Sequence, residues 1–155
     1  GEEVCGDRVE HKRWKDGFIG VLADGMGSGV KANILSTMGS AILSTMLLGG
    51  ESVESAVDVV IRSLPVCSER GMNYCTFSVV NIDKNGVAKL VEFDNPQAWI
   101  IRNRQIVQPE RTLRMIEQKK ITATVIRINL MYPSLFDVSP RISGAATLTT
   151  NAPTT

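Results

Sequence analysis

The 155-residue sequence contains a single histidine, His11, and only three cysteines, and this scarcity narrows the metal chemistry that it can support. Cys5, Cys67 and Cys75 are an odd number with no C-x-x-C spacing, which argues against a disulfide framework and against a structural zinc site. We interpret them as reduced thiols, as is usual in the cytoplasm. Any metal bound here would therefore take oxygen ligands and would be a hard cation.

Long apolar runs and an excess of one charge are also missing. No apolar run approaches the length of a membrane span, and the start Gly1-Glu2-Glu3-Val4 is too polar and acidic for a signal peptide. The formal net charge of +1 gives no electrostatic reason to expect nucleic acid or a membrane surface as a partner. The sequence predicts a cytoplasmic protein with no membrane contact of its own, although the parent chain could be membrane-tethered, since the sequence does not begin with Met.

The order of the apolar patterns predicts one α+β domain. A length of 155 residues with 43% hydrophobic residues suits a single domain with a core of its own. Residues 6–14 and the continuous apolar run 17–23 are predicted to form a hairpin, and two helices follow, starting near Val30 and at Val53. From 74 to 107, strand-forming segments alternate with turn signals, which is typical of an antiparallel meander.

The two predicted helices differ in how clearly their faces are marked. The first, which ends at Gly49-Gly50, has the following residues on one face at helical spacing: Ile34, Met38, Ala41, Ile42, Thr45 and Leu48. The second is predicted to be capped by Ser52, with its apolar face made of Val53, Val57, Val60, Ile61 and Leu64. Both patterns are those of amphipathic helices.

The C-terminal part is less regular. The mixed-charge run 111–120 is interpreted as a solvated face or a switch-like loop. Residues 143–155 consist of Thr, Ala, Gly, Pro, Ser, Leu and one Asn without periodicity, so we predict a disordered tail there, after a single domain over residues 1–142.

Two carboxylates stand at Gly-flanked strand ends. Asp7 follows Gly6, and Asp24 precedes Gly25 at the end of the apolar run. If the two strands pair as a hairpin, both acids lie at one end of the sheet, where a cation between them would relieve their repulsion. Mg²⁺ or Mn²⁺ suits such a set of oxygens. The alternative is that both are ordinary surface acids beside turns, since Asp-Gly is a common turn pair.

The glycine-rich turn that follows also allows a nucleotide interpretation. Gly27, Gly29 and Ala32 match the loose dinucleotide pattern G-x-G-x-x-A. That interpretation requires a strand after the helix to close a βαβ unit, and the sequence predicts a second helix there. A turn that simply needs glycine for positive φ is the plainer alternative.

Taken together, these motifs resemble a known family. Gly6-Asp7, followed by residues 21–29 (Val-Leu-Ala-Asp-Gly-Met-Gly-Ser-Gly) leading into a Ser/Ala-rich helix, are similar to the SpoIIE-type branch of the metal-dependent (PPM) protein serine/threonine phosphatases. The segments 76–82, 91–96 and 99–103 are similar to later strands and turns of the same family. The resemblance covers about residues 1–120.

This resemblance implies a PPM-type antiparallel β-sandwich flanked by helices, with two Mn²⁺ or Mg²⁺ ions bound at one end. Asp7 and Asp24 would be catalytic residues and metal ligands, and the carbonyl of Gly25 would complete one metal's shell. The implied reaction is attack of metal-activated water on a phosphoserine or phosphothreonine. The implied substrate is a small phosphorylated regulatory protein of the anti-anti-sigma type, in sporulation or stress signalling.

The sequence departs from the family near its C-terminus. The family has an Asp-Gly turn after a late apolar strand, whereas here Asp137 is followed by Val138 and no second late aspartate exists. An incomplete PPM-type domain with weakened catalysis, acting as a binding or regulatory module, is therefore the alternative function. The oligomeric state stays open, with a homodimer among the options.

Overall fold

The structure is a computed structural model that describes residues 4–14, 17–27, 29–64, 66–67, 72–73, 75–116, 119–127, 136–137 and 147–150, with side chains described for 4–13, 17–27, 29–64 and 75–116. It contains the following elements in chain order: β1 (Asp7–Trp14), β2 (Gly17–Gly25), α1 (Gly29–Leu48), α2 (Val53–Ser63), β3 (Val66–Cys67), β4 (Met72–Asn73), β5 (Cys75–Ile82), β6 (Val87–Phe93), β7 (Trp99–Arg102), β8 (Gln105–Val107), β9 (Arg111–Ile116), β10 (Lys119–Arg127), β11 (Phe136–Asp137) and β12 (Thr147–Thr150).

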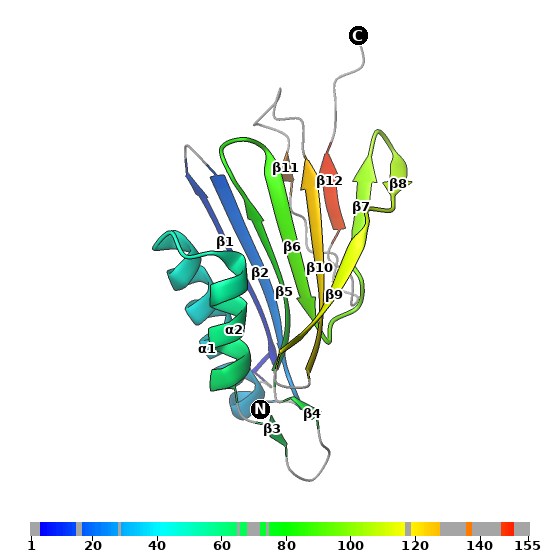
Figure 1. Ribbon diagram of the computed structural model, residues 1–155. Helices are drawn as coiled ribbons and strands as arrows, with labels where there is room; N and C mark the ends of the chain where they lie inside the picture. The colour runs from blue at the N-terminus through cyan, green and yellow to red at the C-terminus, as the bar shows by residue number, and fades with distance from the viewer. Residues whose placement is uncertain are drawn as a thin grey trace.

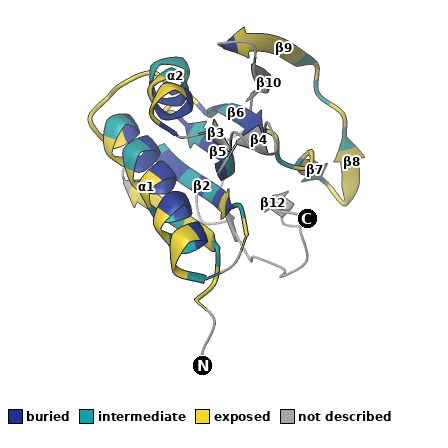
Figure 2. Cartoon of the chain, turned by 90° about the horizontal axis from the view of Figure 1, so that it is seen from below, coloured by how far each residue is buried: buried dark blue, intermediate teal, exposed yellow. Residues whose placement is uncertain are grey.

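A six-stranded sheet in the order β1-β2-β5-β6-β10-β9 forms the centre of the molecule. Helices α1 and α2 cover one of its faces, and a four-stranded sheet in the order β11-β12-β7-β8 lies on the other side (Figures 1 and 2). The predicted α+β class is therefore confirmed. No helix among the described residues is long and apolar enough to cross a membrane.

The first hairpin and the β5–β6 hairpin form as predicted. β1 pairs antiparallel with β2, and β2 then pairs antiparallel with β5. The turn between β5 and β6 closes where the Asp83 N–H donates to the Val87 carbonyl and the Gly86 N–H to the Asp83 carbonyl. The mixed-charge run, predicted to be a solvated face or a switch-like loop, forms strand β9 and the start of β10, which pair with each other and, through β10, with β6. Four of the six residues of β9 are exposed, so β9 agrees with the solvated face and not with the loop.

The main core lies between the sheet and the helices. Alternate residues of β2, among them Ile19, Val21 and Ala23, are buried there because successive strand residues point to opposite faces. Across β5 and β6, the rings of Phe77 and Phe93 pack with their centroids 5.3 Å apart. A smaller apolar cluster on the opposite face includes Phe18, Val80 and Leu90.

Helix α1 buries a different face from the one that the sequence pattern marked. Its core side consists of Ala32, Leu35, Ser36, Gly39, Ser40, Leu43, Ser44 and Leu47. The serines are accommodated there because their hydroxyls find acceptors. Ser36 donates to the Asn33 carbonyl at 3.1 Å, and Ser40 and Ser44 donate to the two carboxylate oxygens of Glu10 on β1, at 3.3 and 2.9 Å. Apolar residues lie all round this helix, so spacing alone could not identify the buried side.

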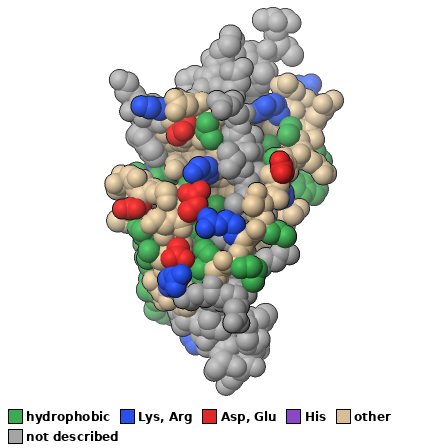
Figure 3. All heavy atoms as spheres, in the orientation of Figure 1, with side chains coloured by type: hydrophobic (Ala, Val, Ile, Leu, Met, Phe, Trp, Pro, Cys, Tyr) green, Lys and Arg blue, Asp and Glu red, His purple; other side chains and the backbone are tan. Residues whose placement is uncertain are grey.

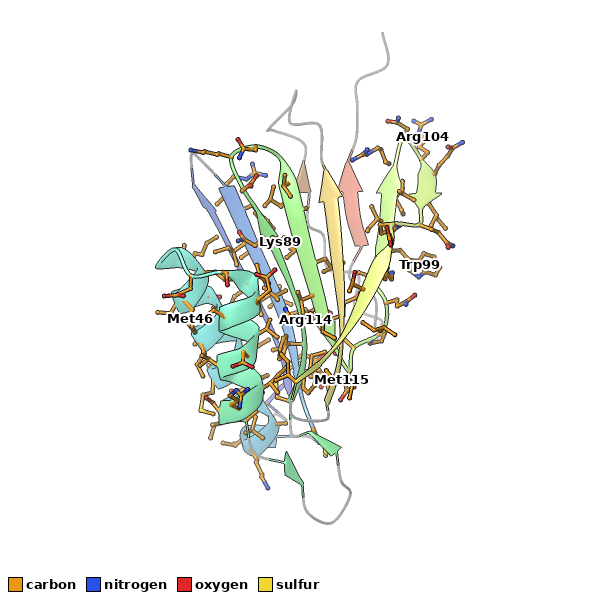
Figure 4. The ribbon with its side chains drawn as sticks, in the orientation of Figure 1. Met46, Lys89, Trp99, Arg104, Arg114 and Met115 are labelled. Carbon is orange, nitrogen blue, oxygen red and sulfur yellow. The ribbon has the colours of Figure 1, made fainter. Side chains whose placement is uncertain are left out.

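Helix α2 agrees with its prediction. The Ser52 hydroxyl accepts from the Ser55 N–H at 3.1 Å as the N-cap, and every residue predicted for the apolar face is buried. Lys89 on β6 donates to Glu54 at 3.1 Å, within a patch of mixed charge over α2 and the sheet (Figures 3 and 4). Burial tends to raise the pKa of Glu54, but its backbone hydrogen bond and the cations Lys89 and Arg114 outweigh this and lower it.

The C-terminal range contains one departure. Thr147–Thr150 form β12, which pairs parallel with β7 and antiparallel with β11, although residues 143–155 were predicted to be a disordered tail. The rest of that range lies outside the described residues. β12 adds a backbone partner for β7, which is a long-range pairing that local composition does not reveal.

Candidate metal centre at the end of the first hairpin

The candidate site is built where β1, β2 and the start of α1 meet. Gly25 ends β2, and its N–H donates to the Gly6 carbonyl at 3.1 Å. A Cβ on Gly25 would lie only 2.0 Å from the Ala32 carbonyl oxygen, and a Cβ on Gly6 would lie 3.1 Å from the Ala32 side chain. Both glycines are therefore needed for α1 to approach the strand ends this closely.

The turn between β2 and α1 uses glycine for a second reason. Gly27 and Gly29 have φ values of +94° and +76°, in the left-handed region that favours glycine. Ala32 is fully buried against the strand ends. The strand that follows the helices in the central sheet, β5, pairs antiparallel with β2. The described residues therefore contain no βαβ unit here, and the G-x-G-x-x-A match marks a tight turn.

Asp7 and Asp24 are direct cross-strand partners in the β1–β2 register. Side chains directly opposite each other in an antiparallel pair have Cβ atoms about 4.5–5.5 Å apart, and like charges in that position repel. The pKa of Asp24 is raised above its usual value of 3.8, first by desolvation, then by the charge of Asp7 and by a hydrogen bond with Asp7. The two acids thus share one small region and interact there.

The third predicted group also lies at this point. The Gly25 carbonyl oxygen lies close to Gly6, the residue before Asp7, since a Cβ added to Gly6 would be 3.2 Å from that oxygen. Two carboxylates and a carbonyl are hard oxygen donors, which fit Mg²⁺ or Mn²⁺ with waters completing the shell. Among the described side chains, no group of three or more His, Cys, Asp or Glu gathers anywhere. The side chain of Asp137, on β11, lies outside the described residues.

A hydrogen-bonded chain of neutral residues starts on the strand next to Asp24. Thr76 on β5 is the cross-strand partner of Asp24. Its hydroxyl donates to the Asn95 side-chain oxygen at 2.6 Å, and the Asn95 amide donates to the Ser78 hydroxyl at 3.0 Å. These residues carry no local signal, because Asn95 looks like part of an ordinary turn, and only the tertiary fold brings it to Thr76, the strand neighbour of Asp24.

The same face of the sheet holds a buried carboxylate further along. Glu92, the cross-strand partner of Ser78, is 3% exposed and accepts hydrogen bonds from the Ala98 N–H and from Arg111. Arg111 also donates to the Ala98 carbonyl at 2.9 Å. This buried charge is fully partnered by the loop before β7 and by β9, so it serves to hold those segments on the sheet.

Cys75 lies beside the acid pair in the register but belongs to the core. It is the cross-strand partner of Gly25 and is fully buried. Burial, and then the charge of Asp24, raise the pKa of its thiol to about 11. The thiol is therefore protonated at neutral pH, donates to the Thr76 carbonyl at 3.4 Å and packs in the main core.

Comparison with solved structures decides the fold. No protein-family model and no curated protein sequence matches the chain. Among solved structures eight chains match, including the PP2C phosphatase domain of SpoIIE from Bacillus subtilis, determined with a fragment of its regulatory domain, at a TM-score of 0.64 and 19% identity. The chain has a PP2C-type phosphatase fold.

Other solved structures agree with this PP2C-type fold. The RsbU and RsbW domains of a Mycobacterium tuberculosis protein align with a TM-score of 0.60 and 18% identity, and RsbX in complex with magnesium aligns with 0.50 and 24%. The SpoIIE alignment covers 80% of this chain and 38% of the SpoIIE chain. The corresponding shares are 81% and 36% for the RsbU and RsbW domains, and 59% and 43% for RsbX. The chain thus spans about two fifths of their length.

Proposed function

We propose that this chain is a metal-dependent phosphatase domain that hydrolyses phosphoserine or phosphothreonine on a small regulatory protein. The observation that carries the proposal is the direct opposition of Asp7 and Asp24 at one end of the central sheet of a PP2C-type fold. Two charged acids in that register repel each other, and either a shared proton or a bound cation can offset their charge. The pair is therefore better explained as half of a metal site than as two surface acids.

In this proposal the residues of the hairpin hold the metal. Asp7, Asp24 and the Gly25 carbonyl would provide the protein ligands for Mn²⁺ or Mg²⁺. When bound, such ions supply an acidified water for attack on phosphorus and offset the charge of the phosphoryl oxygens. Because the pKa of Asp24 is raised, protons compete with the metal for this carboxylate at higher pH than at an ordinary aspartate. The affinity for Mn²⁺ or Mg²⁺ should therefore still increase with pH above 3.8, the ordinary pKa of aspartate.

The proposed substrate is supported by the resemblance and by the neighbours together. SpoIIE, RsbU and RsbX stand among the similar solved structures, and the resemblance implies a phosphorylated protein of the anti-anti-sigma type. An open site at the end of a sheet suits a phosphorylated side chain on a protein surface. We place the protein in the cytoplasm, in the regulation of sporulation or stress.

The test is manganese-dependent hydrolysis of para-nitrophenyl phosphate by the wild type, Asp24→Asn and Asp58→Asn. Asp58 on α2 is the matched control carboxylate. It pairs with Arg62 at a distance of 2.8 Å and does not belong to the hairpin that carries Asp7 and Asp24. We expect Asp24→Asn to lose activity by a factor of about 10² or more and Asp58→Asn to keep it. Full activity in Asp24→Asn would refute the proposed role of the acid pair.

A second function is favoured by one observation. The described side chains contain no third acid near Asp7 and Asp24. A module that binds a phosphoprotein or another partner with little turnover would fit such a reduced ligand set. Calorimetry with Mn²⁺ separates the two functions, because tight binding of two ions per chain would exclude the weakened site.

A further inference from the structure

Asp7 lies on a strand that the central sheet holds from one side. β1 is the first strand in the order of that sheet, and among the described strands only β2 pairs with it. Asp7 is also the first residue of β1, so it stands at a corner of the sheet. Chain segments at such ends open with little free energy unless other contacts hold them. The position of the Asp7 carboxylate relative to Asp24 therefore depends on contacts from outside the sheet.

The Asn33 side chain makes such a contact directly before Asp7. Asn33 lies in the second turn of α1, is half-buried, and donates through its amide to the Cys5 carbonyl at 2.9 Å. Cys5 and Gly6 precede the β1–β2 ladder, which starts at Asp7. The Gly6 carbonyl in turn accepts from the Gly25 N–H at 3.1 Å. Asn33 thus holds the chain one residue before the hydrogen bond that joins the two strand ends.

The same turn of α1 also touches the other strand end (Figure 1). Ala32, the residue before Asn33, packs so closely that a Cβ on Gly25 would lie 2.0 Å from its carbonyl oxygen. Neighbouring residues of one helical turn therefore contact the end of β2 and the segment that leads into β1. Hydrogen bonds behind the ligands orient the ligands of a metal, and their loss typically lowers metal affinity about 10- to 100-fold.

We infer that Asn33 is a positioning residue, which holds the start of β1 so that Asp7 stays opposite Asp24. It acts through the Cys5 carbonyl and the Gly6 backbone. Its effect on metal affinity rests on the proposed function, because that effect requires Asp7 and Asp24 to be metal ligands. Its effect on the two strand ends belongs to the metal-free protein as well and can be measured there.

A second hydrogen bond of α1 provides a matched control. The Ser44 hydroxyl donates to the Glu10 carboxylate on β1 at 2.9 Å, the same length as the bond from Asn33. Glu10 lies three residues after Asp7, about 10 Å along the strand. Ser44→Ala therefore removes one hydrogen bond between α1 and the same stretch of chain, but at a distance from the acids.

Calorimetric titration with Mn²⁺ tests the inference in the wild type, Asn33→Ala and Ser44→Ala. We expect Asn33→Ala to bind Mn²⁺ about tenfold or more weakly than the wild type. Ser44→Ala should bind it within about twofold of the wild type, because distant sites act independently. Alanine is a better helix former than either replaced residue, so neither substitution should weaken α1 itself.

Hydrogen exchange of the metal-free proteins, followed by NMR, gives a second measurement that needs no metal. The Gly25 N–H should exchange roughly three- to tenfold faster in Asn33→Ala, because its acceptor Gly6 is no longer held through Cys5. In Ser44→Ala the Gly25 rate should stay within about twofold of the wild-type rate.

The outcomes separate this inference from the proposed function. Either an unchanged Mn²⁺ affinity or an unchanged Gly25 exchange rate in Asn33→Ala would overturn the inference, while the metal centre stands. Equal changes in Asn33→Ala and Ser44→Ala would also overturn it, since they would show that α1 is loosened as a whole. If the wild type binds no Mn²⁺, the proposed function fails, and the Gly25 exchange rate alone then decides whether Asn33 holds the start of β1.

Discussion

Replacing Asp24 by asparagine should stabilise the metal-free protein, although it removes a predicted metal ligand. Asp24 faces Asp7 directly across the hairpin, and both side chains are exposed. Two unit charges about 5 Å apart repel by about 0.8 kcal/mol at the dielectric constant of water and by about 3 kcal/mol at an effective value near 20. Because both acids are exposed and screened by solvent, the lower value applies, and we expect a gain of about 1 kcal/mol at low salt.

The dependence on pH gives this prediction a sign that can be checked. The raised pKa of Asp24 means that the folded protein keeps this proton to higher pH than the unfolded chain does. The folded state therefore binds more protons in a window that opens at about pH 3.8 and extends to the raised pKa, so wild-type stability falls as pH rises through that window. Asp24→Asn should lack this part of the pH dependence.

Manganese should reverse the order of stability. A ligand that binds only the folded state adds about 2.7 kcal/mol at one hundred times its dissociation constant. The wild type should gain this stabilisation and Asp24→Asn should not, so the variant is the more stable protein without metal and the less stable one with it. In 1 M salt, where the Debye length is about 3 Å, the metal-free advantage of the variant should largely disappear.

Thermal and urea unfolding measure this reversal directly. A gain of about 1 kcal/mol corresponds to an increase in Tm of roughly 2–4 °C for a chain of this size. Asp58→Asn is the control, since it removes an exposed ion pair with Arg62 and should cost at most about 0.5 kcal/mol, with or without metal. The reasoning is refuted if Asp24→Asn destabilises the metal-free protein, or if manganese stabilises both proteins equally.

Three further predictions follow from single positions. Gly25→Ala should lower the free energy of unfolding in urea by about 3 kcal/mol or more, because the new Cβ would lie 2.0 Å from the backbone of α1. Gly27→Ala should lower it by only about 1–2 kcal/mol, because position 27 has open space around it and only its φ of +94° is unfavourable for alanine. Asn95→Ala should cost about 1–2 kcal/mol by the same measurement, because it leaves two hydroxyls of β5 without their partner; an unchanged midpoint would contradict this. Iodoacetamide at pH 8, followed by peptide mass spectrometry, should label exposed Cys5 quickly and Cys75, with a pKa of about 11, only after unfolding; equal rates would show that Cys75 is accessible.

Local patterns were sufficient for the parts of this protein in which one signal dominates. The first hairpin, the capped helix α2 and the Asp-Lys-Asn-Gly turn agree with the structure because turn residues, an N-cap and a one-sided apolar face act over a few neighbouring residues. The acids were also placed correctly at one sheet end, because a hairpin register follows from the position of its turn.

Long-range pairing decided the rest. The buried side of α1 could not be identified from spacing, since apolar residues lie on several sides of the helix and its core side includes serines, two of which donate to Glu10 on β1. The pairing of β10 with β6, and of β12 with β7, depends on partners distant in the sequence. Asn95 meets Thr76 and Ser78 on β5 for the same reason. Residue types and local spacing thus determine which elements form, whereas only tertiary packing determines which faces and which distant side chains meet.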